Sequence, residues 1–297
     1  MRRRRSPRPV ADDIVGVHNG YCAPADSPMS DALRGFDPKG TYDAASLDYE
    51  QASRDFWEQL SSRAVALASP MPGESVLDVP CGTGPSVVAA ARAVGPGGHV
   101  LGVDYADQML AIAQEKVTAT GLTNVELQAG DMADLELAPG SFDVVLCGLG
   151  LFFVEDMPGL VRSLWELLRP GGRIAITVLG DRFFAPMLDV FVDAVHAEHP
   201  GFDVVEPWRR TEDPGTLQAI MTDAGVPASE IHSEVDVILV EPSDWWRIVL
   251  GTGLRRTAMA LDPDEAERVR RRCEQFMQEH DVRQVELASH YISAVRP

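Results

Sequence analysis

The sequence predicts an α/β protein built on a doubly wound parallel sheet. From residue 75 to about residue 180, strand-like apolar runs alternate with helical patterns. Several of the runs are continuously apolar, which is typical of parallel strands covered by helices on both faces. Helices that connect parallel strands cross over right-handed, so the expected layers are helix, sheet and helix. The 297 residues are enough to bury a large core without disulfides or metal.

The first half of the chain supplies most of the expected sheet. A helical pattern over residues 42–68 comes first and ends before Pro70 and Pro72. Asp107 is a suitable N-cap for a later helix that Gly121 ends. We expect strands at 75–79, 99–103, 125–129, 142–147 and 173–179, and helices at 86–94, 107–120 and 156–169.

The second half is less regular, and its elements are expected to flank the sheet. Helical patterns occupy residues 183–199, 214–224, 243–250 and 264–279. Strands are expected at 231–240 and 284–295. Arg268 and Arg270–Arg272 are interpreted as the solvated face of the last helix.

Composition and charge exclude several classes of function. The chain has 26 basic and 45 acidic side chains, a net charge of −19, so we expect no nucleic-acid partner. No apolar run approaches the ~20 residues of a membrane-spanning helix. The arginines at 2–5 precede no apolar segment, so we interpret residues 1–40 as a flexible arm rather than a signal peptide, with an anionic docking tail as the alternative. A cytoplasmic protein is expected, without disulfides or metal, because the cysteines are dispersed: Cys22, Cys81, Cys147 and Cys273.

A glycine-rich turn after the first strand is the first candidate binding site. Residues 78–84 read Asp-Val-Pro-Cys-Gly-Thr-Gly and lead into a helix, whose N-terminus offers free N–H groups. The second strand ends in Asp104, where a carboxylate can accept hydrogen bonds from both hydroxyls of a ribose. The dinucleotide pattern GxGxxG is absent, and Asp78 would repel a pyrophosphate. The two acids favour a nucleoside joined to an amino acid.

These motifs resemble those of class I S-adenosylmethionine-dependent methyltransferases. The resemblance rests on residues 78–84, Asp104, residues 130–132 (Gly-Asp-Met) and residues 168–172 (Leu-Arg-Pro-Gly-Gly). It covers about residues 70–180 and is nearest in style to the ubiquinone/menaquinone-biosynthesis and natural-product methyltransferases. It implies a Rossmann-like seven-stranded sheet with the last strand antiparallel, and S-adenosylhomocysteine as the product. It also implies a helical lid over residues 41–72 and a methyltransferase domain over 73–297, with lid insertions about 183–228 and 241–283.

The resemblance implies a role for each motif residue. The Gly82 and Gly84 backbone would lie on the methionine part of the cofactor, and the loop that Asp78 opens would orient its amino group. Asp104 would bind the ribose. The remaining expected cofactor contacts are Pro80, Cys81, Tyr105, Met109, Gly130, Asp131, Met132, Cys147, Gly148 and Leu149. Pro80 departs from the family, which commonly has Gly there, and removes one N–H donor. Taken singly, Asp78 or Asp131 could be a cap, and Gly84 could close-pack a helix on the sheet.

The catalytic residues are not identified by the sequence. Related enzymes often carry a histidine after the fourth strand, but residues 149–153 read Leu-Gly-Leu-Phe-Phe. The weak candidates are His18, Tyr21, Tyr42, Asp181 and His196.

Aromatic residues in the covering segments predict the acceptor. The expected substrate contacts are Tyr42, Tyr49, Phe152, Phe153, Phe183, Trp245 and Trp246. They fit a small apolar metabolite, methylated on oxygen or carbon. The alternative is an enzyme of the same fold that binds S-adenosylmethionine but catalyses a cyclisation or rearrangement without methyl transfer. A monomer or a homodimer is expected.

Overall fold

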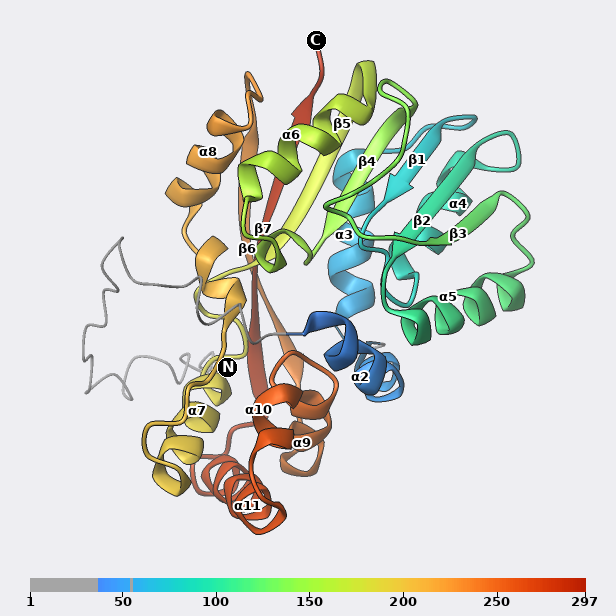
Figure 1. Ribbon diagram of the computed structural model, residues 1–297. Coiled ribbons are helices and arrows are strands. Elements are labelled where there is room, and N and C mark those ends of the chain that lie inside the picture. The colour runs from blue at the N-terminus through green and yellow to red at the C-terminus, as the bar shows by residue number, and fades with distance from the viewer. Residues whose placement is uncertain (1–36, 54–55) are drawn as a thin grey trace, which may run out of the picture.

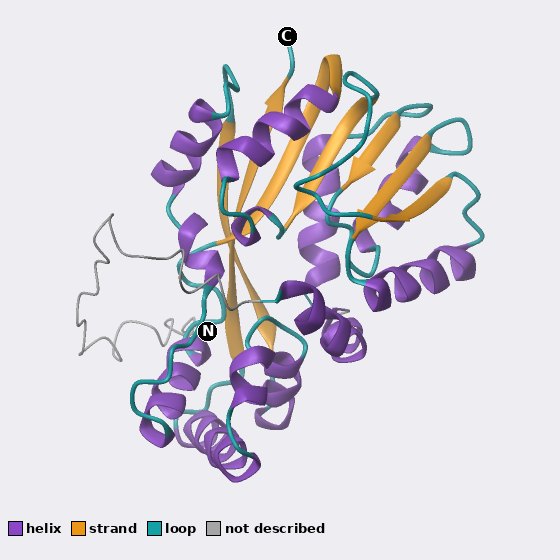
Figure 2. Ribbon diagram, in the orientation of Figure 1, coloured by secondary structure: helices purple, strands orange, loops and turns teal. Residues whose placement is uncertain are grey.

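The computed structural model describes residues 37–53 and 56–297. Within these residues, seven strands form a single mixed sheet that runs through the upper part of the molecule in Figure 1. The expected N-terminal arm, with His18 and Tyr21, lies outside the described residues. Helices cover both faces of the sheet (Figure 2), which confirms the predicted α/β class.

The strand order of the sheet is β3-β2-β1-β4-β5-β7-β6. β1 to β5 are parallel, and β7 is antiparallel to β5 and β6, as the resemblance implied. The strands are β1 (Ser75–Asp78), β2 (His99–Asp104), β3 (Val125–Ala129), β4 (Phe142–Gly148), β5 (Leu168–Leu179), β6 (Glu230–Leu239) and β7 (Gln284–Val295). The order reverses between β1 and β2 on one side and β4 on the other, so a crevice is expected at their carboxyl ends.

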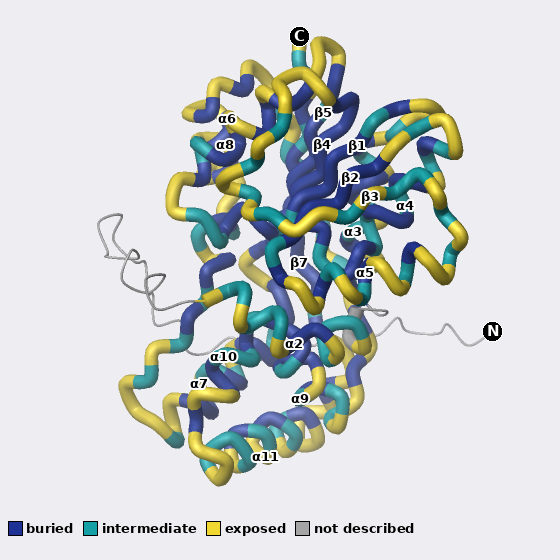
Figure 3. The backbone as a smooth tube through the Cα atoms, turned by 45° about the vertical axis from the view of Figure 1, so that its right-hand side comes forward, coloured by how far each residue is buried: buried dark blue, intermediate teal, exposed yellow. Residues whose placement is uncertain are grey.

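Two layers of helices bury the sheet (Figure 3). α3 (Trp57–Ala68) and α4 (Pro85–Val94) pack together on one face, and α5 (Asp107–Thr120) continues this layer beside β3. α6 (Met157–Leu167) and α8 (Pro214–Asp223) pack together on the other face. In α6, apolar side chains at helical spacing from Leu160 to Trp165 are buried, and the Asp156 side chain caps the helix by accepting from Gly159 N. The 3-10 helix η2 (Leu151–Phe153) precedes α6.

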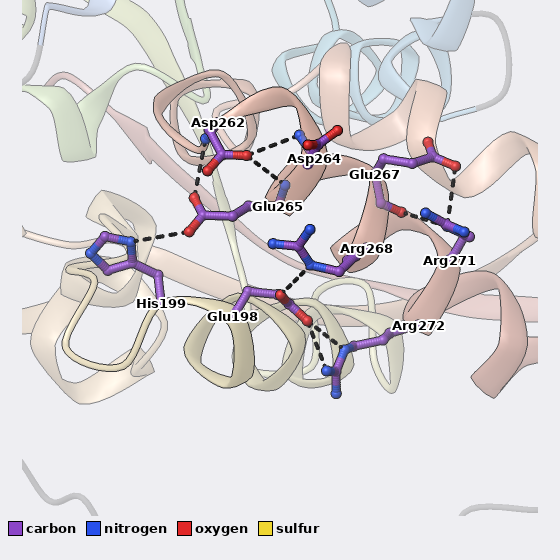
Figure 4. Close-up of polar contacts among 9 residues, drawn as sticks. All are labelled: Glu198, His199, Asp262, Asp264, Glu265, Glu267, Arg268, Arg271 and Arg272. Carbon is purple, nitrogen blue, oxygen red and sulfur yellow. Dashed lines mark hydrogen bonds and ion pairs between the residues drawn. The ribbon is translucent and has the colours of Figure 1, made fainter.

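A second group of helices gathers around the extended ends of β6 and β7. It comprises α7 (Met187–Glu198), α9 (Pro242–Leu250), α10 (Arg255–Ala260) and α11 (Pro263–Glu279), and we call it the helical cluster. Asp262 and Glu265 form a capping box that starts α11. Glu198 of α7 accepts hydrogen bonds from Arg268 and Arg272 of α11 (Figure 4). Two of the arginines expected only to be solvated therefore also join two helices.

α2 (Pro38–Ser53) lies between the helical cluster and the sheet (Figure 1). It packs on α5 and α9 and touches α10. The predicted single helix over 42–68 is wrong, because α2 and α3 are separate and Phe56 before α3 has a non-helical φ of −143°. The predicted helix over 183–199 starts only at Met187. A residue before proline, here Ala185, avoids the helical region, and Phe184 is left-handed at φ +60°.

One further boundary and two further elements differ from the sequence prediction. β5 already begins at Leu168, so the Pro-Gly-Gly turn lies within its range. α10 and the 3-10 helix η3 (Pro207–Thr211) were not predicted. In the part of the chain that the structure describes, no helix is long and apolar enough to cross a membrane.

Candidate cofactor and substrate site

A cavity of about 400 Å³ lies at the carboxyl ends of β1, β2 and β4. One side of it is formed by the loops that follow these strands, and the opposite side by α2, α3, η3 and the turn between α9 and α10. The switch in strand order thus positions a ligand site where open α/β sheets place it.

Asp104 ends β2 and lines the cavity. Its two carboxylate oxygens accept hydrogen bonds from Gly82 N at 2.8 Å and Ala106 N at 2.9 Å. Burial raises the pKa of Asp104, and the backbone donors oppose that rise. The carboxylate therefore joins the glycine loop to the β2–α5 connection and faces the ligand with its remaining acceptor capacity.

Asp78 ends β1 and is a buried carboxylate, 1% exposed. Ser86 Oγ donates a hydrogen bond to its Oδ2 at 2.5 Å, and the described residues provide no positively charged partner for it. Burial raises the pKa of Asp78 to about 7, with a smaller contribution from Asp104. A buried acid without a cation fits a ligand that carries an ammonium group.

The loop between β1 and α4 is shaped for close approach. Gly82 has φ +53°, and a Cβ added there would meet only Tyr49 Oη, at 3.9 Å. Pro80 packs against the loop after β4, since a Cβ on Gly150 would lie 2.3 Å from Pro80 Cδ. The proline that replaces the usual glycine is thus accommodated by a glycine on the neighbouring loop.

Most of the expected cofactor residues line the cavity. Besides Asp78 and Asp104 they are Pro80, Cys81, Gly82, Tyr105, Met109, Gly130, Asp131, Met132, Gly148 and Leu149. Asp131 Oδ1 accepts from Ala133 N at 2.9 Å, which fixes its turn. Leu149 adopts a left-handed φ of +56°, a strained conformation for a branched residue, beside the end of β4.

Two expected cofactor residues do not line the cavity. Gly84, at φ +80°, faces α5, and a Cβ there would lie 3.1 Å from Ala113 Cβ. This close approach brings two helices together, whereas the alternative left open by the sequence was close packing of a helix on the sheet. Cys147 is buried within β4 with its side chain in the core.

The substrate side of the cavity is aromatic. Five of the expected residues line it: Tyr42, Tyr49, Phe152, Phe153 and Phe183. Their rings pack on one another. Tyr49 stacks on Trp57 with ring centroids 5.4 Å apart, and Trp57 stacks on Phe183 at 6.2 Å. Packing on three different segments fixes these rings in place.

The expectation for Trp245 and Trp246 is wrong, because neither lines the cavity. Trp245 is fully buried and contacts Phe184 edge-on, and Trp246 packs on Phe191. Among the catalytic candidates that lie in the described residues, Tyr42 alone lines the cavity. His196 is exposed and bonds the backbone oxygen of Phe202, and Asp181 is also exposed.

Several cavity residues were missed by sequence reasoning. Ser86, Trp208, Thr252 and Leu254 are the clearest of them. Ser86 follows the glycine turn, so its position at the N-terminus of a helix was a usable signal. Trp208 and the Thr252–Leu254 turn reach the cavity through tertiary folding, which no local pattern reports.

Among the described residues, the charged side chains that line the cavity are all acidic. Its described lining holds four carboxylates, Asp78, Asp104, Asp131 and Glu155, and no histidine, lysine or arginine. Such a site repels phosphates and admits cationic or neutral ligands.

Comparison with known proteins identifies the family. A model described as "Methyltransferase domain" matches residues 76–172. Nocamycin O-methyltransferase of Saccharothrix syringae is 31% identical over 209 residues, which cover 66% of this chain and 75% of that protein. The chain belongs to the methyltransferases of this family. It is an S-adenosylmethionine-dependent methyltransferase.

Two further relatives extend the comparison. The demethylmenaquinone methyltransferase of Listeria monocytogenes serotype 4a is 43% identical over 103 residues, 35% of this chain and 44% of that protein. This match therefore spans less than half of the relative. Phosphoethanolamine N-methyltransferase 2 of Haemonchus contortus, solved with S-adenosyl-L-methionine, shares the fold. Its TM-score is 0.54 at 19% identity, over 86% of this chain and 57% of that one.

The residues at the methyltransferase's β1 and β2 ends fit the cofactor. Asp78 offers a buried anion for the amino group, Gly82 an open backbone, and Asp104 an acceptor for ribose hydroxyls. When bound, S-adenosylmethionine supplies a methyl group on a positively charged sulfur, a carbon already activated for displacement. What the protein must add is orientation of the acceptor and exclusion of water.

Proposed function

We propose that this enzyme transfers the methyl group of S-adenosylmethionine to an oxygen or carbon nucleophile of a small apolar metabolite. The observation that carries the proposal is the continuity of one cavity from the cofactor carboxylates to the stacked rings of Tyr49, Trp57 and Phe183. Aromatic walls with few polar groups suit an apolar and planar small molecule. The printed names of the O-methyltransferase and quinone-methyltransferase relatives support the same class of acceptor.

The negative charge of the cavity lining argues against phosphorylated acceptors. Without a basic group in the described lining, a phosphate or a coenzyme A ester would enter against four carboxylates. The net charge of −19 argues against nucleic acid in the same way.

We further propose that α2 and the helical cluster act as the lid. Tyr42 and Tyr49 of α2, and Thr252–Leu254 between α9 and α10, line the cavity opposite the sheet. A cover of this kind would exclude water during transfer. The cytoplasmic location and the choice between monomer and homodimer stay predictions from the sequence.

The test is transfer of an isotope-labelled methyl group. The purified enzyme is incubated with methyl-deuterated S-adenosylmethionine and the apolar extract of its host, and products are followed by mass spectrometry. We expect a labelled small molecule together with an equal amount of S-adenosylhomocysteine. A label that appears only in phosphorylated or macromolecular material would contradict the proposal. Conversion of an extract compound without S-adenosylhomocysteine would favour the cyclisation or rearrangement instead.

A further inference from the structure

The phenol of Tyr49 lies where the cofactor side and the substrate side of the cavity meet. Its ring is held between Tyr42, edge-on at 6.1 Å, and Trp57, stacked at 5.4 Å. Its hydroxyl points to the glycine loop, because a Cβ on Gly82 would lie 3.9 Å from Tyr49 Oη. Packing thus directs one protein hydroxyl at the methionine end of the cofactor site.

This hydroxyl has no hydrogen-bond partner among residues 37–53 and 56–297. Tyr49 is partly buried, and a tyrosine O–H at such a position usually finds a hydrogen-bond partner. Because Tyr49 lines the cavity, its hydroxyl is open to a ligand that enters the cavity.

Tyr49 stays protonated, so its phenol is available as a neutral hydrogen-bond donor. The groups that face it are Asp78 from β1, Asp104 from β2, and Glu50 and Tyr42 from α2 itself. Burial raises the pKa of Tyr49 well above its usual value, and these neighbours raise it further. The phenol is therefore not a base that could deprotonate an acceptor.

The described cavity offers no other group suited to remove a proton from an acceptor at the transfer point. Asp78, Asp104 and Asp131 form the cofactor side of the cavity. Glu155 is exposed, and Arg210 donates to its backbone oxygen from η3. An ordinary alcohol, whose proton must be removed during attack, would be a poor acceptor here.

We propose that Tyr49 donates a hydrogen bond to the methyl-accepting group, and that this group is the oxyanion of an acidic hydroxyl, an enolate or a phenolate. The inference rests on the proposed function and names its acceptor class. The hydroxyl loses its proton to solvent before transfer. A bond then forms between the oxyanion, or its conjugated carbon, and the methyl carbon. The carbon–sulfur bond breaks and leaves its electron pair on sulfur. For attack by oxygen, no proton moves in this step. After attack by carbon, the hydrogen on that carbon leaves to solvent as the conjugated system is restored.

A consequence concerns the order of binding. Two carboxylates, Asp78 and Asp104, face Tyr49, so an oxyanion alone would be repelled from this position. The positive sulfur of the cofactor reverses that balance. We therefore expect the acceptor's ionised form to bind well only beside a positively charged cofactor.

The experiment uses umbelliferone, an acidic phenol whose absorption reports its ionisation. It is titrated into the enzyme loaded with sinefungin, which carries an amine in place of the methylsulfonium, or with neutral S-adenosylhomocysteine. We expect bound umbelliferone to ionise at a pH about one unit lower in the sinefungin complex than in water, and less readily in the S-adenosylhomocysteine complex. Tyr49→Phe should reduce this shift and lower kcat/KM for umbelliferone about tenfold or more, the size of one hydrogen bond to a charged group.

Matched variants and acceptors separate the alternatives. Tyr49→Phe keeps the stacked ring and removes a hydroxyl without a described partner, so its melting temperature should match that of the wild type. Asp134→Asn, at an exposed position outside the cavity lining, is the control, expected to leave turnover and the pH profile unchanged. β-Naphthol should be methylated and its saturated counterpart, β-tetralol, should not.

Three results would overturn the inference. They are equal methylation of β-tetralol and β-naphthol, a pH profile that Glu155→Gln abolishes, and failure of the cofactor-loaded enzyme to bind umbelliferone or β-naphthol. The labelled-methyl experiment on the extract is independent of these compounds. A labelled product that lacks an acidic hydroxyl precursor would leave the proposed function standing while this inference falls.

Discussion

At the scale of single residues, the site is built around buried acids that the protein does not neutralise itself. Asp78 has Ser86 as its hydrogen-bond donor, and Asp104 has two backbone N–H groups. Both pKa values are raised by burial. We expect a ligand with an ammonium group and ribose hydroxyls to compensate the cost of burying such groups.

Asp78→Asn should therefore stabilise the ligand-free protein while weakening cofactor binding. The folded state holds the Asp78 proton up to a pH of about 7, and the unfolded state releases it near its ordinary value of 3.8. Stability from this group is thus present at low pH and is lost as pH rises from about 4 to 7. At a pH near 8, the variant should gain on the order of 2–4 kcal/mol in unfolding free energy.

The measurement is denaturant unfolding of wild type and variant across this pH range, paired with a cofactor titration. The difference between the two proteins should shrink as the pH falls toward 4. A variant that is less stable than the wild type at every pH would show that the carboxylate is structurally required instead.

More of the expected cofactor residues than of the expected substrate residues line the cavity, for a physical reason. Asp78, Gly82 and Asp104 sit at strand ends, where local pattern and topology together fix their position. Trp245 and Trp246 lie in α9, which packs on α11 and contacts Phe191 of α7. The position of these two side chains therefore depends on tertiary contacts. Gly84 matched a motif but serves helix packing against Ala113.

At the scale of elements, ion pairs join α2 to α5 and α10. Lys39 pairs with Asp107 at 2.8 Å, Lys116 with Glu50 at 3.0 Å, and Arg255 with Asp48 at 2.7 Å. Among its described side chains, Ala45 is the apolar one that is fully buried. The rings of Tyr42 and Tyr49 also pack on Phe153 and Trp57, so weakening an ion pair should loosen α2 rather than release it.

Arg255→Gln should therefore speed release of bound S-adenosylhomocysteine. An ion pair at the surface contributes ~0.2–1 kcal/mol, so we expect a rate about two- to fivefold higher. Wild-type release should also accelerate with salt, because salt screens these pairs. Stopped-flow fluorescence can follow release, since Trp57 lines the cavity.

The control for this experiment is Arg268→Gln. It removes an arginine that pairs with Glu198 between α7 and α11 (Figure 4), and neither residue lines the cavity. Release should be unchanged in this variant. If salt and Arg255→Gln both leave the release rate unaltered, α2 does not gate the site.

Sequence periodicity predicted the strands and the core helices and failed at connections. All seven strands occur where expected, with β5 starting five residues earlier. For β1, β2 and β4 the signal was a continuous apolar run in a covered sheet. The break between α2 and α3 was missed, since the helical pattern continues across it. The start of α7 depends on a left-handed Phe184 whose amide bonds Glu286 O at 2.7 Å, a contact made 102 positions away in the sequence.

At the scale of the whole molecule, one cavity connects two parts with different tasks. The ends of β1 and β2 supply carboxylates and backbone on one side, and α2, α3, η2, η3 and the residues before α7 supply aromatic rings on the other. The acidic surface and the acidic cavity both favour neutral or cationic ligands over phosphates. Methyl transfer from a sulfonium requires mainly orientation of the acceptor and exclusion of water.

The central claim is that the cofactor lies across the ends of β1 and β2, and calorimetry of S-adenosylmethionine binding tests it most directly. Asp104→Asn should bind the cofactor about tenfold to a hundredfold more weakly, because hydrogen bonds from ribose to a charged acceptor are lost. Asp134→Asn removes the same charge from an exposed position outside the cavity lining and should bind normally. Near-normal affinity in a folded Asp104→Asn enzyme would contradict the account.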